Sequence, residues 1–516
     1  MGNVVDSQLK SSDDEPLPFA AVGGETSNPT LQNVTLRAVP EQDAVPALDS
    51  KPNFAVVIEL RAPPLSHQGP QARAPIDLAM VLDVSGSMKG PKLDLVKRAA
   101  GFVVDNLGPS DRLSLVCFST SARIVLPLHE TTEVGRANAR QAVNSLFSDN
   151  GNTNIADGLT KGLQVLEERS HRNPVASIMF LSDGKDNYSP RIPMAQPYLH
   201  LLPPSMRPGV EKKPFSIPIH TFGFGSDHDP LAMHAIATLS GGTFSFIESY
   251  EMVQDAFAKC IGGLLSVVVR DLRLTLRSAS HGVRINSIPS GSYASEISGL
   301  QGSRGSITVG DLYADEEKDF LIDISVPAYA FSVEEEENEN ERRTPLVDVT
   351  CSYKDVGSNE RVEMESAEIK RPGFVAPADV KVKLEVDRQM NRLHAAEGLA
   401  EAQGAAEKGN LKEARAILSS TRSTVSASAS GQAGDGLSLQ LEAEMRETEE
   451  KMGCKRTYEQ VGRAYALSSM SAHSNQRAST RRRAESGDAY VTPNMANMVT
   501  KSHQLIKIED VKEEQD

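Results

Sequence analysis

The pattern of hydrophobic and polar residues changes three times along the chain, and each change predicts a different kind of structure. Residues 33–39 and 53–62 alternate between apolar and polar side chains, which is typical of half-buried antiparallel strands. From residue 76, nearly continuous apolar runs alternate with segments whose apolar residues recur every three or four positions. The runs predict strands covered on both faces, and the segments predict amphipathic helices. We therefore expect an α/β fold here, a doubly wound and mainly parallel sheet.

The strands expected in this α/β region are residues 76–83, 112–118, 122–128, 175–184, 216–225 and 242–249, and the helices are residues 92–107, 133–147, 154–169, 230–240 and 251–266. After residue 266 the period returns to two, and further antiparallel strands are expected at 267–278, 305–312, 318–327, 345–355 and 361–372. The alternating pattern within residues 31–62 predicts antiparallel strands as well. We therefore predict one antiparallel β-sandwich that is split in sequence, with the α/β domain inserted in it.

A helical region follows residue 377, beginning with two helices joined at "EKGN". The last residues are polar and of low complexity, as are the first. The predicted organisation is a disordered segment at 1–30, an N-terminal sandwich segment at 31–72, the α/β domain at 74–266, a second sandwich segment at 267–373, a helical region at 377–470 and a disordered tail at 471–516.

Charge and cysteine content narrow the class of protein. The net charge of −15 provides no general field for nucleic acid or for an anionic membrane. The four cysteines are far apart and form no CxxC pair, which argues against a zinc site and a disulfide scaffold and favours a reducing compartment. With neither a signal peptide nor an apolar run long enough for a membrane span, we expect a cytoplasmic protein without a stable membrane anchor.

The stretch "VLDVSGSMKG", residues 81–90, carries the first chemical signal. A buried strand ends in Asp83, and Ser85 and Ser87 follow at alternate positions around a glycine. Ligands of such sheets lie at the carboxyl ends of the strands. One carboxylate and two hydroxyls there are hard oxygen donors that suit Mg²⁺ or Mn²⁺. The alternative is structural, because either serine could cap the following helix and Asp-Ser-Gly combinations are common in turns.

Two further stretches fall at equivalent places. In "DNGNTNIADGL", Thr153 stands just before a helix, and in "IMFLSDGKDN", Asp183 follows another buried strand. Each again has a structural alternative, an N-cap for Thr153 and a turn for Asp183. Loops at the carboxyl ends of neighbouring parallel strands can converge on one point, so the three stretches together favour a single site.

These five residues resemble the metal-ion-dependent adhesion site of von Willebrand factor type A domains, whose signature is Asp-x-Ser-x-Ser followed by a Thr and an Asp. The resemblance covers about residues 74–266. It implies that Ser85, Ser87 and Thr153 ligate Mg²⁺ or Mn²⁺ directly and that Asp83 and Asp183 hold its bound waters. It also implies a protein partner whose Asp or Glu carboxylate completes the coordination shell, so that the metal joins two proteins and catalyses nothing.

A narrower resemblance covers more of the chain. "DDEPL", "VTLRAVPE", "IDLAMVLDVSGSM" and "LHAAEGLAEAQGAAEKGNLKEARAIL" are similar to plant proteins that combine a type A domain with a RING ubiquitin-ligase finger. Here no Cys/His-rich segment precedes "DDEPL", and the chain resembles a member without a RING. G-x-S-x-G, P-loop and HExxH motifs are also absent.

We therefore expect a non-enzymatic, intracellular module that binds protein partners through the metal. The alternative is a RING-less partner or decoy of the type A ubiquitin ligases, acting as a substrate-binding subunit, with RING-bearing relatives among its partners.

Overall fold

The computed structural model describes residues 33–65, 73–188, 198–207, 217–249, 252–329, 342–376, 380–479 and 489–513. These residues form two compact units, one containing residues 75–261 and 501–513, the other containing residues 33–74 and 262–500. The segment expected to be disordered at 1–30 lies outside the described residues. The domain boundaries given above stay predictions.

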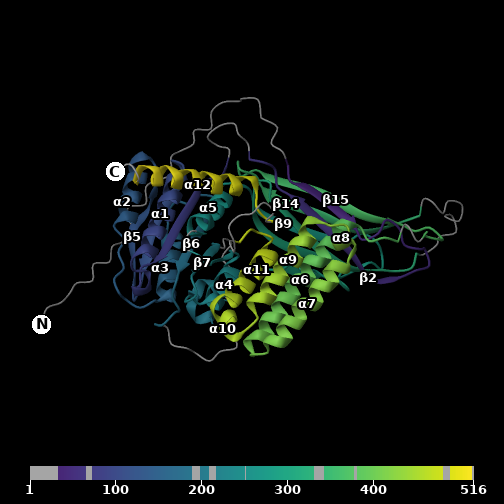
Figure 1. Ribbon diagram of the computed structural model, residues 1–516. Helices are drawn as coiled ribbons and strands as arrows, with labels where there is room; N and C mark the ends of the chain where they lie inside the picture. Colours follow the sequence, from purple (N-terminus) through teal and green to yellow (C-terminus); the bar gives the residue numbers. More distant parts are fainter. Residues whose placement is uncertain are drawn as a thin grey trace. The chain divides into compact units, whose positions relative to one another are not determined.

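The first unit contains a six-stranded sheet with the strand order β5–β4–β3–β6–β7–β8, of which β5, β6 and β7 are labelled in Figure 1. Its strands are β3 (Ile76–Asp83), β4 (Arg112–Phe118), β5 (Ala122–Glu130), β6 (Val175–Ser182), β7 (Ile219–Phe224) and β8 (Phe244–Ile247). Every neighbouring pair is parallel except β4 and β5, which form an antiparallel edge. All eight residues of β3 are buried, as its continuous apolar run predicts. The mainly parallel α/β fold is confirmed.

The helices of this unit are α1 (Pro91–Asn106), α2 (Glu133–Asn144), α3 (Ile155–Glu167), α4 (Pro230–Ser240) and α5 (Val253–Leu264), with short 3₁₀ turns η1 (Gly86–Met88), η2 (Leu199–Leu201) and η3 (Pro204–Met206). Two glycines let α3 lie close to the sheet. A Cβ at Gly158 would lie 2.8 Å from the Phe118 ring, and one at Gly162 would lie 2.6 Å from Val81. This close packing fixes the start of α3 beside the carboxyl ends of β3 and β4.

The second unit contains a β-sandwich of two antiparallel sheets. The first has the order β1–β2–β13–β10, from β1 (Thr35–Pro40), β2 (Lys51–Arg61), β10 (Arg284–Ser287) and β13 (Glu317–Val326). The second has the order β11–β12–β9–β14–β15, from β9 (Val267–Ser278), β11 (Ala294–Ser298), β12 (Arg304–Tyr313), β14 (Arg343–Lys354) and β15 (Glu360–Lys370). Because β2 pairs with β13, strands from before and after the α/β segment share one sheet. This confirms the predicted sandwich, split in sequence.

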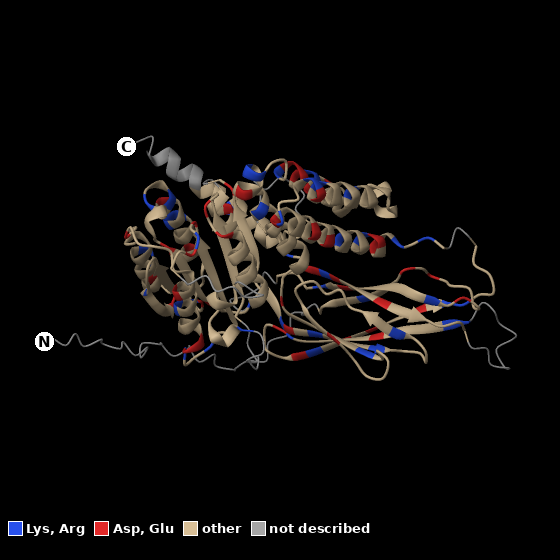
Figure 2. Cartoon of the chain, turned by 90° about the horizontal axis from the view of Figure 1, so that it is seen from below, with Lys and Arg blue, Asp and Glu red and all other residues tan. Residues whose placement is uncertain are grey.

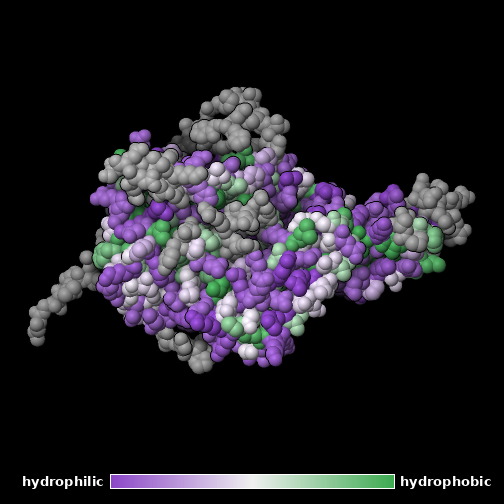
Figure 3. Space-filling view, viewed as in Figure 1, coloured by the Kyte–Doolittle hydropathy of each residue, from purple (hydrophilic) through white to green (hydrophobic). Residues whose placement is uncertain are grey.

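The helical region packs around small residues. Its elements are α6 (Leu384–Glu407), α7 (Leu411–Ala427), α8 (Ala429–Gln432), α9 (Gly436–Lys451), α10 (Lys455–Thr457), the π-helical segment η6 (Tyr458–Gly462) and α11 (Arg463–Asn475). Alanines of α6, among them Ala395 and Ala402, share an apolar cluster with Leu418 of α7 and Leu441 of α9. Lys, Arg, Asp and Glu are interspersed on the helices and on the sandwich strands (Figure 2). The surface visible in Figure 3 is mostly hydrophilic, with apolar residues scattered over it.

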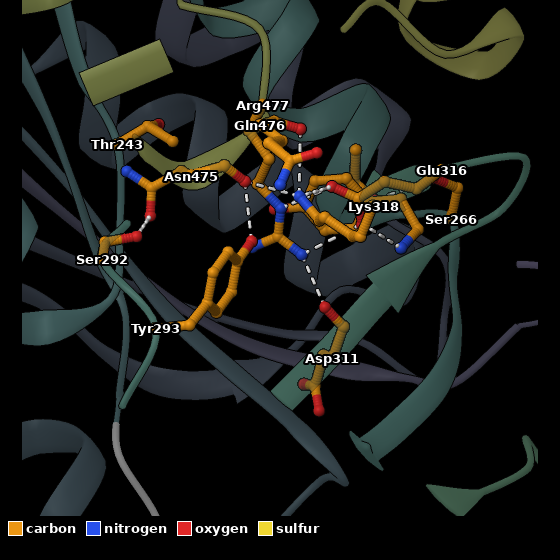
Figure 4. A network of polar contacts seen from close by, with 12 residues as sticks. Thr243, Ser266, Ser292, Tyr293, Asp311, Glu316, Lys318, Asn475, Gln476 and Arg477 are labelled. Atoms are coloured by element: carbon orange, nitrogen blue, oxygen red, sulfur yellow. Dashed lines mark hydrogen bonds and ion pairs between the residues drawn. The ribbon is translucent and has the colours of Figure 1, made fainter. Parts of the chain in front are cut away.

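A buried polar network joins the end of α11 to the sandwich (Figure 4). Lys318 of β13 is fully buried and donates to the backbone oxygens of Asn475 and Gln476 at 2.6 and 3.0 Å. Tyr293 donates to the same Asn475 oxygen at 2.6 Å. Glu316 accepts from Lys318 at 2.8 Å and from Arg477 at 2.7 Å. The turn after α11 is thus held by ionic and backbone contacts inside the second unit.

The tail expected to be disordered at 471–516 contains regular structure. Helix α11 continues to Asn475, and helix α12 spans Pro493–Glu513. In the second unit, Asn494 donates to the backbone oxygen of Gly262 at 2.5 Å, and Met495 is buried. In the first unit, His503 lies 2.7 Å from Asp255. The disordered assignment is wrong for these residues, because a few apolar contacts and side-chain bonds hold a helix that a polar composition does not indicate.

Candidate metal centre

Asp83 lies fully buried at the carboxyl end of β3, with both carboxylate oxygens occupied by hydrogen bonds. Its Oδ1 accepts from the backbone N–H of Ser85 at 2.9 Å, and its Oδ2 accepts from the hydroxyl of Ser182 at 2.7 Å. Burial raises the pKa of Asp83 to about 6, in spite of these bonds, and the nearby charge of Asp183 acts in the same direction. A buried carboxylate with a raised pKa is one that a bound cation would stabilise.

The two serines of the turn connect Asp83 to the loop after β6. Ser85 Oγ lies 3.1 Å from Ser87 Oγ, and Ser87 donates to Oδ1 of Asp183 at 2.6 Å. Neither serine caps the following α-helix, because α1 has Gly90 as its N-cap. Ser85 precedes the 3₁₀ turn η1 without a side-chain capping bond. The capping alternative for the two serines is therefore not what the structure contains.

Thr153 approaches the same loop from the other side. It is buried, its backbone N–H donates to Asn187 Oδ1 at 2.9 Å, and its carbonyl accepts from the Asn187 N–H at 3.2 Å. A Cβ at Gly184 would lie only 2.7 Å from Thr153 Oγ1, so the hydroxyl lies directly against the residue after Asp183. The N-cap of α3 is Asn154, not Thr153. Thr153 is thus a buried loop residue beside the two other stretches.

The loop before Thr153 holds the serine turn in place through backbone contacts. Gly86 N–H donates to the Gly151 carbonyl at 3.1 Å, and Asp149 N–H donates to the Val84 carbonyl at 3.2 Å. Ser148 Oγ donates to the Ser85 carbonyl at 2.8 Å. The serine hydroxyls are therefore presented by a turn fixed on both sides.

Lys92 was not among the predicted site residues, yet it contacts one of them. Its ammonium nitrogen lies 2.6 Å from Oδ2 of Asp183, and this lysine side chain is 22% exposed whereas Asp183 is fully buried. The only signal in the sequence is its place in the first turn of the helix that follows the serine turn. The contact joins residues 91 positions apart, and a pattern read along the chain does not reveal it.

The structure brings all five predicted residues to one place, where the strand order changes direction. From β3 the chain moves to β4 on one side, and β6 lies on the other side of β3. Ligands of open α/β sheets bind at such a point. The donors there are carboxylate and hydroxyl oxygens, which fit Mg²⁺ or Mn²⁺. Over the described residues of the chain, no group of three or more His, Cys, Asp or Glu side chains is placed so that it could hold a metal ion.

The same described residues include no helix that is long and apolar enough to cross a membrane. All four cysteines are free: Cys117 and Cys351 are buried, Cys260 is half-buried and Cys454 is exposed. The expected cytoplasmic location stays a prediction.

Comparison with known proteins identifies the family of the α/β domain. Residues 77–259 match the von Willebrand factor type A domain family, and residues 435–504 match a family described as VWA / Hh protein intein-like. A solved structure, the von Willebrand factor type A protein from Catenulispora acidiphila, has a TM-score of 0.59 at 18% identity and covers 83% of this chain and 90% of its own. That likeness extends the shared fold well beyond the α/β unit.

Two similar curated proteins come from Arabidopsis thaliana. The E3 ubiquitin-protein ligase WAV3 is 32% identical over 440 residues, which cover 81% of this chain and 53% of WAV3. The E3 ubiquitin-protein ligase WAVH1 is 27% identical over 410 residues, which cover 76% of this chain and 52% of WAVH1. The chain thus spans about half the length of these relatives.

The relatives correct one expectation. From the absence of catalytic motifs we expected a protein that is not an enzyme, and the ligase names of the similar proteins overturn that expectation. This chain matches only about half of each of these relatives, so the motifs within it do not represent the whole of those proteins. The matched segment also extends far beyond the α/β unit, so the likeness to the plant proteins does not depend on that unit alone.

Domains of this type typically mediate protein–protein interaction, and the parallel sheet, the turn after β3 and the family match agree: residues 77–259 of this chain are a von Willebrand factor type A domain.

Proposed function

We propose that the type A domain binds an acidic side chain of a protein partner through a divalent cation, Mg²⁺ or Mn²⁺. Ser85, Ser87 and Thr153 would ligate the ion, and Asp83 and Asp183 would hold its water ligands. The observation that carries this proposal is the hydrogen-bonded series Ser85–Ser87–Asp183, with distances of 3.1 and 2.6 Å. It assembles oxygen donors from two separate loops at the ligand-binding edge of the sheet.

The charge of the site supports a carboxylate-bearing partner. All three proposed direct ligands are neutral hydroxyls, so a divalent ion held there keeps positive charge toward an incoming ligand. An Asp or Glu side chain would supply the missing negative charge. The cation would provide the attraction, and the protein would provide position through the turn fixed by Gly151 and Ser148.

The first experiment is capture of partners from a lysate with the wild-type chain, in Mg²⁺ and in EDTA, with Ser87→Ala beside it. Ser145→Ala is the matched control, because that hydroxyl is exposed at the end of α2 in the same unit and contacts only a backbone oxygen. Partners lost in EDTA and with Ser87→Ala, but kept with Ser145→Ala, support the proposal. Partners retained under all four conditions contradict it.

We also infer that the chain works within a ubiquitin ligase as the component that binds the substrate. The similarity to WAV3 over 440 residues supports this role. The test is ubiquitylation of a partner captured in the first experiment, with E1, E2, ubiquitin and this chain, in the presence and absence of a RING-bearing relative. We expect ubiquitylation of the partner to require this chain and to be lost with Ser87→Ala. Modification that is unchanged when the chain is left out would overturn the inference.

A further inference from the structure

We propose that Lys92 is a built-in competitor of the divalent cation, whose ammonium group pairs with Asp183 and must leave that carboxylate when the metal binds. This inference rests on the proposed function, because it concerns the same site. It assigns to Lys92 the control of how tightly the metal is held. Neither the signature of the site nor its five predicted residues include a lysine.

The contacts of Asp183 support this assignment. Both of its carboxylate oxygens are engaged, Oδ1 by the Ser87 hydroxyl and Oδ2 by Lys92, each at 2.6 Å. Asp183 is fully buried, so its negative charge needs a positive partner inside the domain. A cation that draws on Asp183 therefore meets an ammonium group already in contact with that carboxylate.

The environment of Lys92 lets it leave. Its side chain is 22% exposed, and its charge sits at the end of a flexible four-carbon stem from the first turn of α1. The ammonium also lies 5.9 Å from the centre of the Phe224 ring, which gives it a further weak contact at the edge of the site. Lys92 can therefore turn toward solvent without moving the backbone of the helix.

Removal of the positive charge of Lys92 should have two consequences. Two cations a few ångströms apart repel, so removal of the ammonium should tighten metal binding by at least about tenfold. Removal should also leave Asp183 buried without its partner, so the metal-free domain should become less stable. A lysine that served only to stabilise the fold would produce the second effect without the first.

The test is titration of the full chain with MgCl₂ and with MnCl₂ by isothermal calorimetry. Lys92→Met removes the charge and keeps the apolar stem. Lys92→Gln keeps a neutral donor for Asp183 and serves if the methionine variant does not fold. Lys92→Arg keeps the charge and should bind metal as the wild type does. Lys97→Met, five positions further along α1, is the control for removing a lysine from the same helix.

Tighter binding by at least about tenfold in Lys92→Met or Lys92→Gln, with Lys92→Arg and Lys97→Met unchanged, is the expected result. Thermal unfolding in EDTA should show a lower midpoint for Lys92→Met, and added Mg²⁺ should raise it by more than in the wild type. Metal binding by the wild type with equal or weaker binding by both uncharged variants overturns the inference and leaves the proposed function standing. Absence of metal binding in every variant overturns both.

Discussion

Arg477 donates hydrogen bonds to both carboxylate oxygens of Glu316, at 2.7 Å from Nε and 3.1 Å from a terminal guanidinium nitrogen. The two residues are 161 positions apart; Glu316 is buried, and the Arg477 side chain is 11% exposed. Lys318 contacts the same carboxylate at 2.8 Å. The end of the helical region is thus held to the sandwich by a buried anion between two cations (Figure 4).

This arrangement predicts loss of stability in acid. Burial alone would raise the pKa of Glu316, but the positive charges of Arg477 and Lys318 outweigh it and lower the pKa to about 2. The folded pKa lies below the unfolded value, so the stabilisation is complete above pH 4.5 and is lost as the pH falls toward 2. We expect the contribution of Glu316 to the stability of the second unit to fall by about 3 kcal/mol across that range.

The measurement is urea denaturation followed by circular dichroism at pH 5.5 and pH 2.5. The Glu316→Gln variant should be less stable than the wild type at pH 5.5. Its stability should fall less on acidification, because the titrating carboxyl group is gone. Glu368→Gln is the control, since Glu368 pairs with Arg343 at the surface. If the unfolding free energy of Glu316→Gln fell between pH 5.5 and pH 2.5 by as much as that of the wild type, other groups would dominate acid unfolding.

Replacement of Lys318 tests the same network from the other side. Lys318→Met keeps most of the volume but removes three donors from Glu316 and from the backbone oxygens of Asn475 and Gln476. We expect a loss of about 3 kcal/mol in unfolding free energy, since breaking a buried pair strands its partners. Lys354→Met, which removes an exposed pair with Asp271, should cost less than about 1 kcal/mol. Equal effects of the two variants would contradict the role given to Lys318.

The ionised carboxylate of Asp83 should lower the stability of the metal-free protein. Burial raises its pKa to about 6, above the usual value of 3.8 for an aspartate, so its ionised form is disfavoured in the folded state. The contribution of Asp83 to the free energy of unfolding is therefore favourable at low pH and is lost as the pH rises through about 6. The loss amounts to about 3 kcal/mol at neutral pH.

Asp83→Asn should therefore raise the melting temperature in EDTA at pH 7.5. It should also abolish the rise in melting temperature that Mg²⁺ produces in the wild type. Differential scanning calorimetry in EDTA and in Mg²⁺ measures both effects. A lower melting temperature of the variant in EDTA would mean that the bonds from Ser85 and Ser182 need the full carboxylate charge.

The type A fold was predictable because its strands and helices carry strong local signals. Strand β3 is buried along all of its eight residues, and α1 buries residues spaced three and four apart, so the apolar pattern alone indicates both. Strands β10 and β11 were missed for the opposite reason. They have four and five residues, and every residue of β11 is exposed, so no alternation marks it. Their pairing with longer strands forms them.

The sequence indicated that five polar residues meet at one edge of the sheet, but not which charges surround them. Asp83, Ser85, Ser87, Thr153 and Asp183 follow strands or precede helices, and the parallel sheet brings such positions to one edge. The ion pair of Lys92 with Asp183 depends on where α1 packs, and the buried cations around Glu316 depend on how the turn after α11 meets β13. Long-range contacts of this kind leave no periodic signal in the sequence.

Gly184 provides a steric test of whether Thr153 belongs to the metal centre. A Cβ at position 184 would lie 2.7 Å from Thr153 Oγ1, closer than real contacts allow, so Gly184→Ala must push the hydroxyl away. If Thr153 is a ligand, the variant should weaken Mg²⁺ binding by at least about tenfold, the equivalent of about 1.4 kcal/mol. Gly101→Ala is the matched control, because nothing lies within 4 Å of the added Cβ in the middle of α1. That control should keep metal affinity and gain roughly 0.5–1 kcal/mol of stability from helix propensity. Calorimetric titration with MgCl₂ decides the matter, since unchanged affinity in Gly184→Ala would remove Thr153 from the ligand set.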